Sequence, residues 1–252
     1  MSVTGGLPTG DPVVGNSVGG ALAFLVGSRS RLVLVVVTVL VGILMAFFQA
    51  LGLPLELRTF ARVVPLTQLA ISVLTPFATA LLTHDLRTSN ASLRSRWVAA
   101  GIYGLLAGAL GAADAAAAVA VGSGGPLGTV DPWAGAWPAA LGSLVVQLIP
   151  VGVGCAAGLL IRRARYAQLA TIAVPLAASF LLGRYAPDGA TDWVTPLAAA
   201  SHLLPGPMTP LTWAQWVVTA ALWAQVSGVI GPGSRWLAAA SGVTQSVAPS
   251  GA

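Results

Sequence analysis

Lysine is absent from this chain of 252 residues, and cysteine occurs only once, at Cys155. A standard phosphate-binding P-loop uses a lysine to reach the nucleotide phosphates, so we expect no nucleotide cofactor to bind to this chain. A single cysteine excludes an internal disulfide and a zinc site built from several cysteines. Because Cys155 lies inside an apolar run, we interpret it as a small core residue.

Charged residues are scarce as well. They make up 8% of the chain and hydrophobic residues make up 56%, whereas a soluble domain carries about 25% charged residues. Too few polar groups remain to cover a water-facing surface. The apolar residues fall in runs of roughly 20, the length that crosses a bilayer as a helix. Since these runs do not alternate with polar residues, we expect α-helices that satisfy their own backbone groups and no barrel.

Six such runs predict an all-α membrane protein with about six transmembrane helices. Their approximate limits are 32–53, 63–82, 97–121, 139–161, 166–183 and 211–230. Two shorter apolar segments cannot cross the bilayer. Residues 18–28 are expected to form an interfacial helix, and residues 193–205 a short outer interfacial or re-entrant helix anchored by Trp193. The predicted organisation is therefore a tail and interfacial helix over 1–28, a six-span domain over 29–231 and a tail over 232–252.

The arginines indicate the orientation of these spans. If the N-terminus is cytoplasmic, nine of the twelve arginines fall in cytoplasmic segments and only Arg58, Arg62 and Arg184 fall outside. This distribution follows the positive-inside rule, so both termini are predicted to be cytoplasmic. The net charge of +5 comes from arginines placed to meet lipid headgroups, and we therefore expect a lipid partner and no nucleic-acid partner.

Patterns of known membrane enzymes are missing. The chain has no HExxH sequence, and its two histidines, His84 and His202, are far apart, which argues against metalloprotease chemistry. Asp188 and Asp192 superficially resemble the start of a lipid-headgroup transferase motif, but the aspartates needed one and two turns later do not follow. We therefore expect no catalytic residue and no metal site.

Within the spans, Asp114 and several prolines are the candidate functional residues. Asp114 lies 17 residues after Trp97, which is about 26 Å along a helix and close to the outer face of a ~30 Å core. We expect it to reach the outer interface or a watery vestibule, and the alternative is a coupling or substrate carboxylate. The prolines kink helices or free carbonyls, either as hinges of a transport path or as tolerated packing features; they are Pro76, Pro150 and Pro175.

Small residues and one polar segment complete the sequence evidence. Two GxxxG pairs, Gly104 with Gly108 and Gly154 with Gly158, allow close helix packing. The polar segment 84–96 joins the second and third spans, and Ser89 or Asn90 could cap a short helix within it. That helix could bind a partner ATPase, and the alternative is an ordinary positive-inside loop. The candidate coupling residues of this segment are His84, Asp85, Arg87, Arg94 and Arg96.

The whole layout resembles the membrane subunit of type-2 ABC exporters, the ABC-2 family. The corresponding short segments are 17–28 before the first span, 84–96 as the coupling helix, and 193–205 as the outer helix. The loop after the second span lacks the Gly-Thr and the later proline that this family often has there, and the likeness is one of layout, without a specific motif.

The resemblance implies a separate ABC ATPase chain that binds ATP, a second permease chain, identical or homologous, and export across a bacterial plasma membrane. Because charge is nearly absent from the spans, the expected cargo is amphipathic or hydrophobic, such as a drug, an antibiotic or a lipid. The alternatives from other classes are a membrane scaffold or assembly protein and a membrane-embedded enzyme.

Overall fold

The structure is a computed structural model, and it describes residues 27–88, 93–122, 131–187, 189–196, 198 and 209–240. These residues form helices and turns and contain no strand. The helices are α2 (Arg29–Gly52), α3 (Phe60–Thr88), α4 (Leu93–Gly122), α5 (Ala136–Val146), α6 (Leu148–Leu160), α7 (Ala164–Tyr185), α8 (Ala190–Val194) and α10 (Pro210–Ala240), with a 3-10 turn η1 at Leu55–Leu57. The predicted all-α membrane architecture is confirmed.

Five stretches of the described chain are long and apolar enough to cross a membrane. They are Arg29–Gly52, Phe60–Leu86, Arg96–Gly122, Ala136–Leu160 and Ala164–Tyr185, and they coincide with the first five predicted spans. The sixth predicted span lies in α10, which continues past Gly231 to Ala240, where the sequence analysis expected a tail. The count of six spans and the sidedness of the termini stay predictions.

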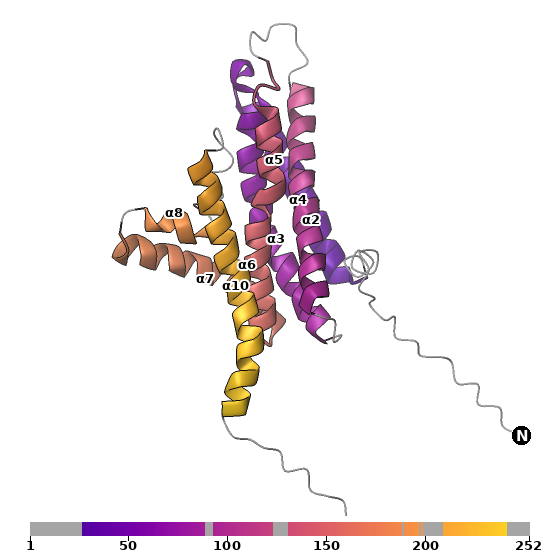
Figure 1. The fold of residues 1–252 in the computed structure, drawn as a ribbon. Coiled ribbons are helices and arrows are strands. Elements are labelled where there is room, and N and C mark those ends of the chain that lie inside the picture. The colour runs from indigo at the N-terminus through magenta and orange to yellow at the C-terminus, as the bar shows by residue number, and fades with distance from the viewer. Residues whose placement is uncertain are drawn as a thin grey trace, which may run out of the picture.

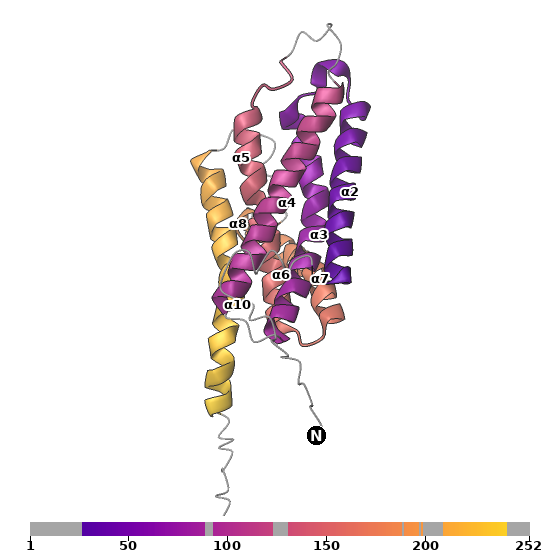
Figure 2. The same cartoon turned by 90° about the vertical axis from the view of Figure 1, so that its right-hand side faces the viewer.

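Most of the helices run side by side along one axis (Figures 1 and 2). α3 is central and packs against α2, α4 and α6, while α10 packs on α6. The start of α2, the end of α3, the start of α4, the end of α6 and the end of α10 all lie at the same end of the bundle. We call it the arginine end, because it carries Arg29, Arg31, Arg96, Arg162, Arg163 and Arg165.

The opposite end holds Arg58, which has a structural role there. Its guanidinium donates hydrogen bonds to the carbonyl oxygens of Leu51 (3.3 Å), Leu53 (2.8 Å) and Gly122 (3.1 Å). The last carbonyls of a helix have no helical donor, and a cation near them is favourable. Arg58 therefore caps the ends of α2 and α4 together, which accounts for an arginine at the end predicted to be outside.

Small residues bring the central helices close together, as the GxxxG pairs predict. A Cβ atom at Gly154 of α6 would overlap the Thr79 side chain and the Pro76 carbonyl of α3. Gly158 meets α3 in the same way one turn later, and Gly104 and Gly108 of α4 meet α5 and α6. Without a hydrophobic driving force between helices in lipid, such close contact provides the packing energy.

The fourth predicted span is interrupted once. α5 ends at Val146 and α6 begins at Leu148, so that Gln147 lies at the break. Pro150 has no N–H group to donate to the carbonyl of Val146 four residues earlier. The missing hydrogen bond explains why the helical ladder is broken at this point.

α7 leaves the bundle although its sequence predicts an ordinary span. Its first half contributes buried Ala167 and Thr171 to contacts with α3 and α6. Beyond Pro175 most of its large apolar side chains are exposed, including Phe180 at 72%. Figures 1 and 2 show α7 inclined strongly across the bundle axis, and α8 returning beside it toward α10.

Candidate functional site

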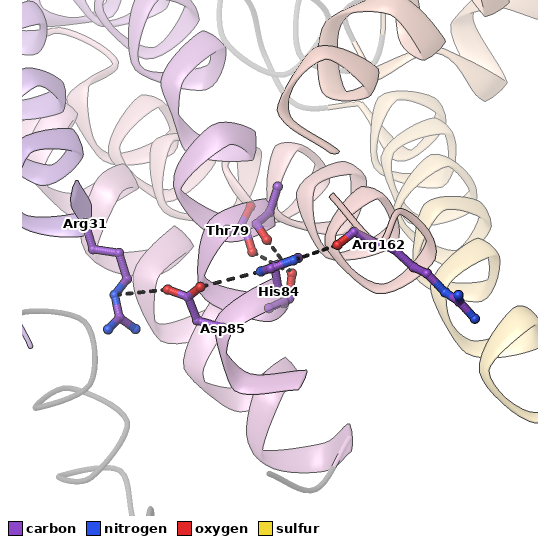
Figure 3. A network of polar contacts seen from close by, with 7 residues as sticks. Arg31, Thr79, His84, Asp85 and Arg162 are labelled. Carbon is purple, nitrogen blue, oxygen red and sulfur yellow. Dashed lines mark hydrogen bonds and ion pairs between the residues drawn. The ribbon is translucent and has the colours of Figure 1, made fainter. Parts of the chain in front are cut away.

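Polar side chains connect three helices at the arginine end (Figure 3). Asp85, near the end of α3, places Oδ2 3.7 Å from Nε of Arg31 at the start of α2. The neighbouring His84 places Nε2 3.0 Å from the carbonyl oxygen of Arg162, which follows α6, and Nδ1 3.6 Å from Oδ1 of Asp85. Two of the predicted coupling residues therefore link α3 to both α2 and α6.

The separate coupling helix predicted within 84–96 is not formed by the described residues. His84, Asp85 and Arg87 belong to α3, which continues to Thr88, and Arg94 and Arg96 belong to α4, which begins at Leu93; residues 89–92 lie outside the described chain. No glycine or proline stops either helix, so both continue. The 30 residues of α4 extend for about 45 Å, more than the ~30 Å of a bilayer core. We call residues 84–88 and 93–96 the α3–α4 tip.

Three of the four predicted path residues surround one cavity. Pro76 of α3, Pro150 of α6 and Pro175 of α7 line a space of about 210 Å³, together with Pro196 after α8. The other lining residues are mostly aliphatic: Leu69, Ser72, Val73, Val153, Thr171, Ile172 and Leu176. The space lies between α3, α6 and α7, and we call it the proline-lined cavity.

Two polar positions interrupt the aliphatic wall of the cavity. Pro76 and Pro175 have no N–H to donate to the carbonyls four residues earlier, which belong to Ser72 and Thr171. Both of these residues line the cavity. Their hydroxyl groups donate to the carbonyls of Leu69 and Gln168, at 2.7 Å each. The cavity therefore has a mainly apolar wall, and two of its lining residues, Ser72 on α3 and Thr171 on α7, have carbonyl oxygens that lack the usual helical donor.

Asp114 lies inside the bundle, and its predicted access to the outer interface or a watery vestibule stays a prediction. It is 8% exposed and lies against Gly42 in the middle of α2 and close to Ile71 of α3. Gly42 is ten residues, or about 15 Å, from the end of α2 at Gly52. The sequence placed Asp114 only by its distance from Trp97 along the chain, and the structure adds its neighbours on α2 and α3.

A buried hydrogen-bond network was missed by the sequence analysis. Nε2 of Gln147 donates to Oε1 (2.7 Å) and to the main-chain carbonyl (3.0 Å) of Gln68. Its Oε1 accepts from the Thr75 hydroxyl at 2.9 Å, and Nε2 of Gln68 donates to the carbonyl of Gly108 at 2.8 Å. The signal was present, because glutamines inside apolar spans are expected to face the bundle interior and pair there.

α8 is attached to the middle of α10. The Thr219 hydroxyl donates to the carbonyl of Trp193 at 3.0 Å, and Nε1 of Trp223 donates to that of Val194 at 3.1 Å. Trp223 is 13 residues into α10, about 20 Å from its start. This position favours the re-entrant alternative for the described part of 193–205. The rest of that segment, and the interfacial helix expected over 18–28, lie outside the described residues.

No metal centre is formed within the described parts of the chain, where no three His, Cys, Asp or Glu side chains gather. Cys155 is 1% exposed and packs in a core cluster with Val151 and Tyr103, which confirms its interpretation as a core residue. Neither a protein-family model, nor a curated protein, nor a solved structure matches this chain. The class that fold and composition define is an all-α membrane protein, and any function must follow from its own residues.

Proposed function

We propose that this chain is the membrane-spanning subunit of an ATP-driven exporter of the ABC type, with the ATPase on a separate chain. The observation that carries the proposal is that one helix, α3, joins two features. Its residues Leu69 to Pro76 form a wall of the proline-lined cavity, and its end at Thr88 belongs to the α3–α4 tip. Pro76 and His84 are eight residues apart, about 12 Å along the helix.

The tip is suited to receive movement from a partner. It carries Arg87, Arg94 and Arg96 on helices that extend past the length of a bilayer core, and such a basic end can dock into an acidic cleft. The contacts of His84 and Asp85 connect it to α6 and α2. Displacement of the tip therefore moves α3 together with its neighbours, and Pro76 provides the weak point where the cavity wall can bend.

The volume and the lining of the cavity indicate which class of cargo it could bind. At about 210 Å³ it is smaller than the ~300–1,000 Å³ of typical small-molecule sites, so it holds one alkyl or aromatic group of a larger molecule. The carbonyls of Ser72 and Thr171 can accept hydrogen bonds from an N–H or O–H group of that molecule. An amphipathic or hydrophobic cargo, such as a drug, an antibiotic or a lipid of a bacterial plasma membrane, has both features.

ATP-dependent transport of a fluorescent cationic amphiphile into lipid vesicles tests the proposal. The chain is co-reconstituted with its ATPase, and a second permease chain where one copurifies. Leu69→Trp fills the cavity, and Leu105→Trp on α4 is the matched control, since the two leucines are 38% and 44% exposed. We expect Leu69→Trp to reduce transport severalfold with assembly intact and Leu105→Trp to leave it within twofold. ATP hydrolysis by the chain alone contradicts the proposal, and stable assembly without ATP-dependent transport supports the scaffold alternative.

The coupling role of the tip has its own test. Arg94→Glu with Arg96→Glu should weaken ATPase association or uncouple hydrolysis from export, because mispaired charges at a contact cost several kcal/mol. Arg235→Glu, near the C-terminal end of α10, is the control. Since arginines also orient spans, both variants must insert with wild-type topology. If the Arg94→Glu, Arg96→Glu variant binds the ATPase and exports normally, the segment has no coupling role and is an ordinary positive-inside segment.

A further inference from the structure

Asp114 is one of only two residues of a charged type that are buried among the described residues. The other, Arg31, has Asp85 within 3.7 Å. Asp114 has no such partner, and its Oδ2 atom is buried without a hydrogen bond. It lies where α2, α3 and α4 meet, and it belongs neither to the proline-lined cavity nor to the α3–α4 tip.

The helices around Asp114 offer no counter-charge. No charged residue occurs over 32–52 of α2, over 63–83 of α3, over the rest of 97–122 of α4, or in α5 and α6. The one titratable group on these stretches outside Cys155 is Tyr103, eleven residues earlier on α4, whose hydroxyl is 3.4 Å from that of Thr38. A Cβ atom built at Gly42 would meet both the carboxyl group of Asp114 and Cδ1 of Ile71, so the carboxyl group lies against α2 and close to α3.

These surroundings favour the neutral form of the carboxyl group. An ionised carboxylate removed from water without a partner is very unfavourable, and such a group takes up a proton instead. Hard cations require several oxygen ligands, and among the described residues Asp114 belongs to no group of three or more His, Cys, Asp or Glu side chains that could hold a metal ion. The species that this position can bind is therefore a proton.

The backbone of α2 covers the carboxyl group at Gly42, where the absence of a side chain allows close contact. A Cβ atom at Gly42 would overlap Oδ2 of Asp114 and would lie 3.1 Å from Cδ1 of Ile71. Only glycine at position 42 allows α2 to pack directly against the carboxyl oxygen, because any Cβ atom there would overlap it. If α2 moves aside by the width of a side chain, water reaches the oxygen and the ionised form becomes favourable.

We propose that Asp114 is a proton-binding site whose occupancy is controlled by α2. The carboxyl group keeps its proton while Gly42 covers it. When α2 moves aside, the O–H bond breaks, the proton passes to water, and a carboxylate remains; the reverse movement takes one proton back. Each opening and closing of the α2 contact thus exchanges one proton, whether or not the chain is part of an exporter.

Infrared spectroscopy of the purified full chain in dodecyl maltoside, a detergent without a carbonyl group, tests the proton directly. The chain has seven acidic residues, so the C=O stretch of a protonated carboxyl is resolvable at neutral pH. We expect the band in the wild type, its loss in Asp114→Asn, and its retention in Asp131→Asn. Asp131 is an exposed acid at the end of the bundle opposite the arginine end. A wild-type spectrum without the band, or a band that persists in Asp114→Asn, overturns the proposal.

A second variant tests the control by α2. In Gly42→Ala the added methyl group should separate α2 from the carboxyl, so the band should disappear at a pH at least one unit lower than in the wild type. Gly52→Ala is the control on the same helix, since a Cβ there meets nothing within 4 Å. If Gly42→Ala does not fold, Ile71→Ala replaces it, because it removes the side chain that lies beside the contact between Gly42 and Asp114. A folded variant that titrates like the wild type refutes the control by α2.

Discussion

Replacing Gln147 by leucine removes the centre of the interior hydrogen-bond network and keeps most of the side-chain volume. Three hydrogen bonds are lost, two to Gln68 and one from Thr75. The Thr75 hydroxyl can still donate to the carbonyl of Ile71, 3.0 Å away, and Nε2 of Gln68 keeps Gly108. The group left without a donor is therefore Oε1 of Gln68, in a side chain that is 0% exposed.

The expected loss of stability follows from these bonds. Side-chain hydrogen bonds in a membrane protein contribute about 0.6 kcal/mol each and up to about 1.7 kcal/mol, so three of them amount to about 2 kcal/mol. The free energy of unfolding is measured by titrating dodecyl sulfate into lipid–detergent micelles and following helicity. Gln225→Leu, at an exposed position of α10, is the control and should change it by less than about 0.5 kcal/mol. If Gln147→Leu costs no more than the control, the network does not stabilise the bundle.

The same unfolding assay tests two further contacts. Arg58→Ala should cost about 1–2 kcal/mol, because it uncaps α2 and α4, whereas Arg62→Ala, at an exposed side chain, should cost little; equal effects would show that the caps are not stabilising. Gly154→Ala should destabilise by about 1–3 kcal/mol through overlap with α3, whereas Gly101→Ala, where a Cβ meets nothing within 4 Å, should stabilise by about 0.5–1 kcal/mol. If Gly154→Ala and Gly101→Ala change the free energy of unfolding in the same direction, the close packing of Gly154 against α3 is contradicted.

The parts of this fold that the sequence predicted are those determined by composition and local spacing. Apolar runs located five membrane-capable helices. The Gly154–Gly158 pair predicted a close contact, and the pair meets α3. The prolines also proved informative, since Pro76, Pro150 and Pro175 converge on one cavity, although nothing in their spacing predicted that they would meet.

The parts that sequence reasoning missed depend on tertiary neighbours. Asp114 is buried against Gly42, which lies on another helix and more than seventy residues away in the sequence. The inclination of α7 depends on where it stops contacting α3 and α6, while its length and apolarity match those of an ordinary span. The α3–α4 tip was predicted as a separate helix because Ser89 and Asn90 favour caps. The described helices instead continue to Thr88 and from Leu93, since no helix breaker stops them.

Site-specific photocrosslinking can show directly whether a separate ATPase docks on the α3–α4 tip. A photoreactive amino acid is placed at Arg94 in the tip or at Asp131, an exposed residue at the opposite end of the bundle, in cells that make the chain at its natural level. Adducts are purified through the chain and identified by mass spectrometry. We expect docking on the tip to give a light-dependent adduct with a P-loop ATPase from position 94 and none from position 131. An ATPase adduct from position 131 alone, or none from either position, contradicts it.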